Sequence, residues 1–108
     1  MRAGKLIHRI TVERYEQTGT DDFGTPILEW STLHTLRAHV EQQSTEEYIR
    51  NIGASEETAV IFHTRFVDGI RPADRVVWRG EAHGIREVAP QGRGEWLELR
   101  TVTLEDSI

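Results

Sequence analysis

The sequence predicts an all-β protein: a small antiparallel β-barrel of about six strands, with one long loop or short helix between the second and third strands. Two observations predict this class. Apolar and polar residues alternate with a period of two along most of the 108 residues, and turn-forming residues interrupt the alternation at short intervals. We expect residues 1–108 to form a single domain, because a chain of this length accommodates one core.

The first two predicted strands show the clearest alternation. The loop between them, residues 18–26, is rich in turn-forming residues, and Pro26 is placed to fix the entry into the second strand. If Trp30 is a core residue, its replacement by alanine should destabilise the protein by about 3–5 kcal/mol. The expected inward residues are Leu6, His8, Ile10 and Val12 in the first strand, and Leu28, Trp30, Leu36, Ala38 and Val40 in the second.

Four more strands are predicted in the second half of the chain. Residues 58–67 are apolar on both faces near Ile61, which is typical of a strand covered on both sides. Residues 75–78 and 83–88 are expected to pair as a hairpin. The last strand, residues 96–102, follows a turn at residues 90–94.

Residues 42–57 break the alternation. Ser44 followed by Glu47 matches a capping box, so a short helix is predicted over residues 45–52, ending at Gly53. The balance of charge in and beside this segment is strongly acidic, because Arg50 stands alone among its glutamates. We expect a solvated loop or a short helix between the second and third strands.

The composition narrows the classes of function. The chain contains no cysteine, which excludes disulfides, thiolate zinc sites and cysteine nucleophiles. A formal net charge of −5 argues against a protein that binds nucleic acid indiscriminately. No apolar run approaches the roughly 20 residues that a membrane-spanning helix needs.

Neither a catalytic site nor a metal or cofactor site is expected. The five histidines are spread over several strands, and none stands in a metal-ligand spacing. The serines lack a nucleophile-elbow motif, and the paired glutamates lie in polar segments. Two alternatives from other classes stay open: a small barrel that binds single-stranded nucleic acid by stacking bases on aromatic rings, and a hydrolase that uses a carboxylate pair.

Short motifs occur in a fixed order along nearly the whole chain. They are Met1, Gly4, Leu6, His8, Arg9 and Ile10; Asp22-Phe23-Gly24 with Glu29-Trp30; Leu36-Arg37-Ala38-His39-Val40-Glu41; Arg65-Phe66 with Gly69-Ile70; Arg75-Val76, Gly80, His83, Ile85 and Val88; and Leu97 with Leu99. In this order and spacing they resemble the head–tail joining, or head closure (stopper), proteins of tailed bacteriophages and related gene transfer agents. His83 departs from that pattern, since the family often has tyrosine or phenylalanine there.

The resemblance implies a virion structural protein at the head–tail junction, assembled in the host cytoplasm. It implies a homo-oligomeric ring of about six or twelve subunits that closes the DNA channel. The implied partners are a portal adaptor protein on one side, a tail terminator or tail completion protein on the other, and packaged DNA held without sequence-specific contacts. A tail-terminator ring protein is a close alternative within this interpretation.

The resemblance also assigns expected roles to particular residues. The segment at residues 42–57 corresponds to a loop that can project into the channel as a plug, where carboxylates would repel the phosphate backbone. A solvated loop that packs against a neighbouring subunit is the equal alternative. The expected plug residues are Ser44, Glu46, Glu47, Arg50, Glu56 and Glu57, and the expected subunit or adaptor interface contains Arg2, Lys5, Arg9, Ile61 and Arg65.

Overall fold

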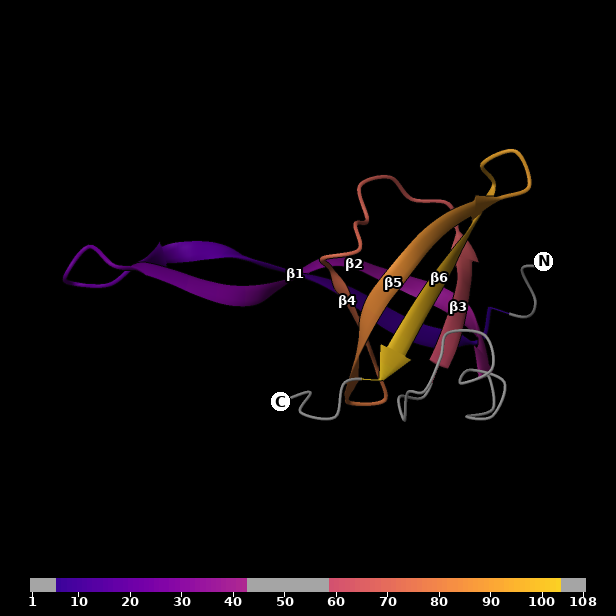
Figure 1. Cartoon of the computed structure of the whole chain (residues 1–108), viewed down its shortest axis with the longest axis horizontal. Helices are drawn as coiled ribbons and strands as arrows, with labels where there is room; N and C mark the ends of the chain where they lie inside the picture. Colours follow the sequence, from indigo (N-terminus) through magenta and orange to yellow (C-terminus); the bar gives the residue numbers. More distant parts are fainter. Residues whose placement is uncertain (1–5, 43–58, 104–108) are drawn as a thin grey trace.

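Six antiparallel strands close into a barrel in the computed structural model, which describes residues 6–42 and 59–103 (Figure 1). Within these two ranges, no helix is long and apolar enough to cross a membrane. The strands are β1 (His8–Thr20), β2 (Pro26–Gln42), β3 (Ala59–Arg65), β4 (Arg75–Trp78), β5 (Glu81–Gln91) and β6 (Trp96–Thr103).

The strands follow the order β1-β2-β3-β6-β5-β4 around the barrel. Pairing between β1 and β4 closes it, with Val12 opposite Val76 at the seam. Every neighbouring pair is antiparallel. The predicted fold class, a six-stranded antiparallel barrel, is therefore confirmed.

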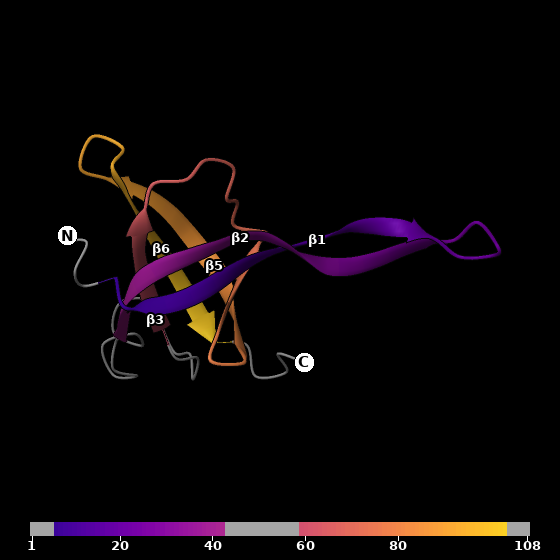
Figure 2. The ribbon, with the colours of Figure 1, turned by 180° about the vertical axis from the view of Figure 1, so that it is seen from behind.

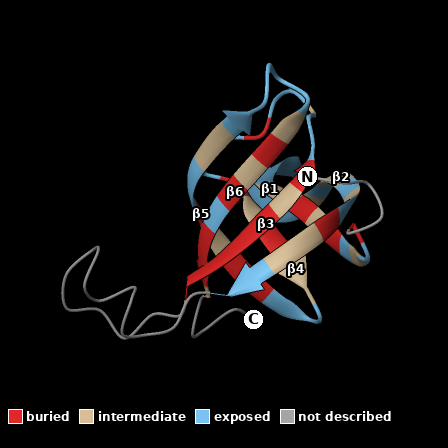
Figure 3. Ribbon diagram, turned by 90° about the vertical axis from the view of Figure 1, so that its right-hand side faces the viewer, coloured by how far each residue is buried: buried red, intermediate tan, exposed pale blue. Residues whose placement is uncertain are grey.

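Side chains from every strand fill the interior of the barrel. Their burial removes apolar surface from water and is the main favourable contribution to folding. Figure 3 shows buried residues recurring along β6 between less buried ones, whereas β3 is buried along most of its length. The core comprises Ile10, Val12, Ala38, Val60, Phe62, Ile70, Val76, Ile85, Leu97 and Leu99.

Strand β3 is buried on both faces, as the sequence predicts. Val60 and Phe62 point into the barrel, whereas Ala59 and Ile61 lie on the other face and are only 5% and 8% exposed. The isolated chain therefore already buries Ile61 without a neighbouring subunit. The predicted helix over residues 45–52, which would precede this strand, lies outside the described residues.

The hairpin of β4 and β5 also agrees with the sequence prediction. It turns through Arg79 and Gly80, whose φ angles are 54° and 78°. Two successive positive φ values are typical of the tight turns whose twist matches that of the paired strands. Strand β5 then runs to Gln91, farther than predicted, and pairs with β6 along its length.

Strands β1 and β2 extend far beyond the barrel, and here two predictions are wrong. Residues 18–26 are not all loop, because β1 continues to Thr20 and β2 begins at Pro26. Leu28 and Trp30 are not core residues either, because they are 50% and 37% exposed. This part of β2 pairs only with β1 and has no barrel interior to face (Figure 2).

His83 is the buried histidine of the barrel interior and is 1% exposed. The rings of Phe62 and Trp78 lie against it, with centroids 5.4 and 6.1 Å away. Its Nδ1 lies 3.2 Å from the hydroxyl of Thr103, while its Nε2 has no hydrogen-bond partner. Burial lowers the pKa of His83, and the nearby charge of Glu81 offsets this only in part.

We therefore expect the protein to lose stability as the pH falls below about 6.5. The unfolded chain takes up a proton on His83 near its ordinary pKa of 6.5, whereas the folded protein resists protonation until a lower pH. Urea denaturation from pH 8 to pH 5 would measure the loss. In His83→Phe the decline between pH 7 and pH 5 should shrink, and an unchanged decline would show that another group causes it.

Candidate functional site

A two-stranded arm, residues 14–31, projects from one side of the barrel (Figure 1). Pairing of β1 with β4 ends at Glu13, and beyond that residue β1 pairs with β2 alone. Val12 pairs with His34 and Glu13 with Thr32, so Leu33 is the extra residue of a β-bulge in β2 at the point where the hairpin leaves the barrel. Bulges bend and twist a strand locally, so this one accounts for the change of direction.

The tip of the arm is a turn organised by Asp21. Its Oδ1 accepts hydrogen bonds from the backbone N–H groups of Phe23 and Thr25, at 2.8 and 2.9 Å. Gly24 adopts a φ of 80°, a conformation that favours glycine. The turn leaves Phe23 93% exposed, which is unusual for a large apolar side chain.

Apolar side chains gather on one face of the arm at its base. Tyr15 and Trp30 are cross-strand partners with ring centroids 5.3 Å apart, and Leu28 lies on the same face. All three are exposed, and no part of the described chain covers them fully. Glu16 and Glu29 are the corresponding pair on the opposite face. Exposed apolar side chains gathered on a projecting ribbon mark a contact surface.

Arg14 and Asp74 join the base of the arm to the barrel. The guanidinium donates two hydrogen bonds to the carboxylate, with N–O distances of 2.8 and 2.9 Å. The backbone N–H of Arg71 donates a third, at 2.8 Å. Burial alone would raise the pKa of Asp74, but these bonds and the two arginine charges outweigh it and lower the pKa below its usual value. Asp74 is therefore a charged anchor with a buried side chain.

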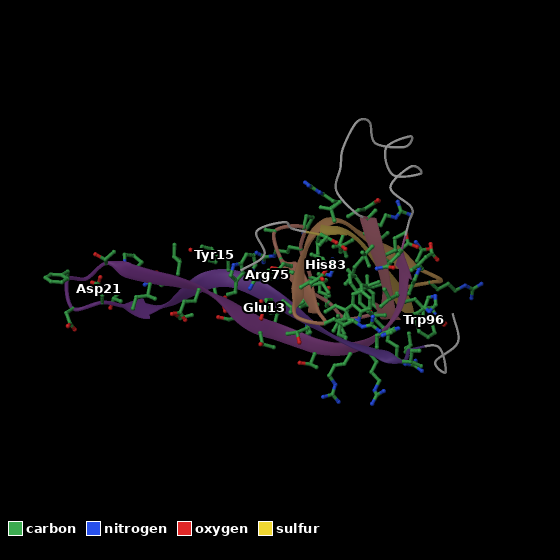
Figure 4. All side chains as sticks on the ribbon, turned by 90° about the horizontal axis from the view of Figure 1, so that it is seen from below. Glu13, Tyr15, Asp21, Arg75, His83 and Trp96 are labelled. Atoms are coloured by element: carbon green, nitrogen blue, oxygen red, sulfur yellow. The ribbon has the colours of Figure 1, made fainter. Side chains whose placement is uncertain are left out.

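A second ion pair lies on the apolar side of the same junction. Arg75 donates to Glu13 at 2.9 Å, and its guanidinium lies over the ring of Trp30 at 4.1 Å from the centroid. Figure 4 shows Glu13, Tyr15 and Arg75 gathered at the base of the arm, with Asp21 at its tip. Together the two arginine–carboxylate pairs tie the arm to the barrel on both of its faces.

The expected interface residues fall in different environments. Arg9 and Arg65 are exposed on the barrel surface, whereas Ile61 is buried and offers little area to a partner. The guanidinium of Arg65 lies 5.2 Å from the centre of the Trp96 ring. Arg2 and Lys5 lie outside the described residues. The expected plug residues, Ser44, Glu46, Glu47, Arg50, Glu56 and Glu57, lie outside them too.

The described surface shows no arrangement that is suited to holding a metal ion. Within residues 6–42 and 59–103, no three histidine or acidic side chains come together as ligands. His63 lies between Glu41 and Glu98, with nitrogen–oxygen distances of 3.8 Å to each. These three side chains form a polar cluster on the outside of the barrel.

Sequence reasoning missed the arm and its anchors. Apolar residues alternate through Leu28 and Trp30, and this pattern does not distinguish a strand that faces a core from one that faces solvent. The length of β2 is the feature that distinguishes the arm. Its 17 residues exceed the roughly 3–10 residues that are usual for a strand, so part of it must extend beyond a small barrel. Arg14 and Asp74 are 60 residues apart in the chain, and no local pattern links them.

The structure is a filled barrel that carries an anchored arm with exposed apolar residues, an arrangement suited to contact with other proteins. The model of the phage head completion protein family matches residues 1–104 of the chain. The chain therefore belongs to the phage head completion proteins, a family of structural proteins of the phage particle. This confirms the resemblance that the ordered motifs indicate.

Two solved structures share the fold. Protein SF1141 from Shigella flexneri 2a, determined in solution, is 25% identical, with a TM-score of 0.77 over 98% of this chain and 99% of that one. A chain in the virion of a native gene transfer agent particle is 19% identical, with a TM-score of 0.60 over 89% of this chain and 93% of that one. The second likeness is one of fold alone. No curated protein matches the sequence significantly.

Proposed function

We propose that this protein forms a ring between the portal adaptor and the tail, closes the DNA channel and provides the surface to which the tail attaches. Family membership over residues 1–104 carries the proposal. The anchored arm supports it, because exposed apolar side chains such as Tyr15 and Phe23 are suited to contacts between subunits or with neighbouring proteins.

The acidic segment between β2 and β3 is the proposed plug. Gln42 pairs with Val60, so the two ends of the segment are held together at one end of the barrel. A segment tethered in this way can project without disturbing the strands that carry it. Its carboxylates would repel phosphate and hold DNA back without adhering to it.

Deleting residues 44–55 tests the plug. Residues 43 and 56–58 would remain between β2 and β3, enough for a short hairpin connection. We expect the barrel to fold, with an unfolding midpoint close to that of the full chain, while heads completed with the variant leak DNA or fail to join tails. DNA retention by purified heads measures the effect.

A matched variant separates charge from length in this test. Replacing Glu46, Glu47, Glu56 and Glu57 with glutamine keeps the segment but removes its repulsion for phosphate. Partial leakage from this variant would support the electrostatic role. Unfolding of the deletion variant would instead show that the segment belongs to the core. Heads that retain DNA but carry tails of abnormal length would assign the protein to the tail-terminator position.

A further inference from the structure

Three arginines form a row across three adjacent strands on the outside of the barrel. Arg9 in β1 is the cross-strand partner of Arg37 in β2. The pairing of Ala38 with Thr64 places Arg37 beside Arg65 at the end of β3. All three side chains are exposed. We call Arg9, Arg37 and Arg65 the arginine row.

Among residues 6–42 and 59–103, the arginine row has no acidic partner, because no carboxylate there forms an ion pair with Arg9, Arg37 or Arg65. The guanidinium of Arg65 lies over the ring of Trp96. Like charges on neighbouring strands repel one another. In a chain with a net charge of −5, such a concentration of cations favours an acidic partner from outside.

A groove beside the arginine row indicates which side chains of a partner would fit there. It has a volume of about 330 Å³ and is lined by Leu6, Thr35, Leu36, Arg37 and Arg65. Leu6 contributes an apolar side chain to the lining, and Arg37 and Arg65 form a cationic edge, while the side chain of Leu36 packs toward the core. The groove therefore suits a large apolar side chain that has a carboxylate next to it.

The tip of the arm presents that combination. Phe23 is almost fully exposed, and the neighbouring Asp22 is exposed as well. Asp21 is already engaged in the turn, which leaves the Asp22 carboxylate for an external contact. An exposed phenylalanine beside a carboxylate complements an apolar leucine beside an arginine.

The tip and the groove lie at opposite ends of the molecule. Leu6 precedes β1, whereas the tip follows it, and the 13 residues of β1 span about 40 Å when extended. The longest dimension of the molecule is 48 Å, and Figure 2 shows the start of β1 far from the tip of the arm. One copy therefore cannot fill its own groove, but a second copy can. Such head-to-tail contacts generate rings when the rotation between copies closes.

We infer that Asp22 and Phe23 at the arm tip of one copy dock into the groove beside the arginine row of the next copy. This inference rests on the proposed ring, because it specifies the contact that joins neighbouring subunits. In this contact Phe23 fills the groove beside Leu6, and Asp22 pairs with Arg37 or Arg65.

Cross-linking between two single-cysteine variants tests the contact directly, because the natural chain has no cysteine. Thr25→Cys places a thiol at the tip, and Thr35→Cys places one in the groove; both positions are exposed. We expect a short bismaleimide to join the two variants when they are mixed, in about tenfold higher yield than it joins either variant to itself.

Charge reversal identifies the residues that hold the contact. Asp22→Arg on the tip variant, or Arg37→Glu on the groove variant, should each reduce the cross-linked product about tenfold, and combining them should restore it. The matched controls are Glu29→Arg on the arm and Arg93→Glu in the turn between β5 and β6. Neither control should change the yield.

The results that overturn the inference differ from those that overturn the proposed function. Rings that assemble without a Thr25→Cys to Thr35→Cys product would refute the docking contact and leave the ring intact. If no ring forms, even on portal–adaptor complexes, both the docking contact and the proposed function are refuted. Loss of binding to a short DNA oligonucleotide in Arg37→Glu, with cross-linking unchanged, would assign the arginine row to nucleic acid and refute the docking.

Discussion

Replacing Phe62 with alanine is expected to lower the free energy of unfolding by about 3–5 kcal/mol. The side chain is fully buried, and the rings of Trp78 and His83 meet it edge to face at 5.8 and 5.4 Å. Two rigid rings held by the barrel wall cannot collapse into the space that alanine leaves. A urea denaturation curve at neutral pH measures the loss directly.

Trp30→Ala is the comparison for Phe62→Ala, because it also removes an aromatic ring but at a position outside the barrel. Trp30 is partly exposed and contacts mainly Tyr15 and Arg75, so we expect a smaller loss, of about 1–2 kcal/mol. This value replaces the larger one that a core position would give. A loss from Trp30→Ala equal to that from Phe62→Ala would contradict the placement of the arm outside the barrel.

Replacing Asp74 with alanine should cost about 2–3 kcal/mol and loosen the arm at its base. The change removes both bonds from Arg14 and the bond from the Arg71 backbone, and leaves these donors without their carboxylate. Chemical denaturation measures the cost. Faster amide exchange in residues 14–20 would report the loosened arm. Asp22→Ala, at the exposed tip, should change stability by less than about 0.5 kcal/mol.

The contribution of Asp74 should also depend on pH. Its pKa is lowered in the folded protein, so the stability that it contributes is fully present above its ordinary pKa of 3.8. The contribution is lost as the pH falls through the lower folded value. The difference in stability between the natural protein and Asp74→Ala should therefore shrink in strong acid, and a constant difference would argue against a charged anchor.

The barrel could be predicted from the sequence because its elements are local and periodic. Ile10 with Val12, and Leu97 with Leu99, repeat at the spacing that places them on one face of a strand, and the structure buries all four. The turn at Gly80 likewise carries its own signal in the sequence. In each case a few neighbouring residues determine the local structure.

The arm and the arginine row depend on long-range pairing and could not be predicted in this way. Trp30 follows the same alternation as Ala38, yet Ala38 lies in the barrel, where β2 pairs on both sides, and Trp30 lies in the arm. Arg9, Arg37 and Arg65 become neighbours only through the registers of three strands. Burial and proximity across strands are set by tertiary pairing, which a single sequence does not reveal.

The packed interior of the barrel also limits the path that DNA could take, because DNA could not pass through a single copy. Phe62, Leu97 and Leu99 lie in the core of the described barrel and are at most 1% exposed, so side chains fill its interior. In the proposed ring, a conduit for DNA would therefore be a space enclosed by several copies and lined by their outer surfaces. Its bore would be set by the number of copies around the axis and its lining by surface charge, so both could change while the hydrophobic packing of each copy stayed the same.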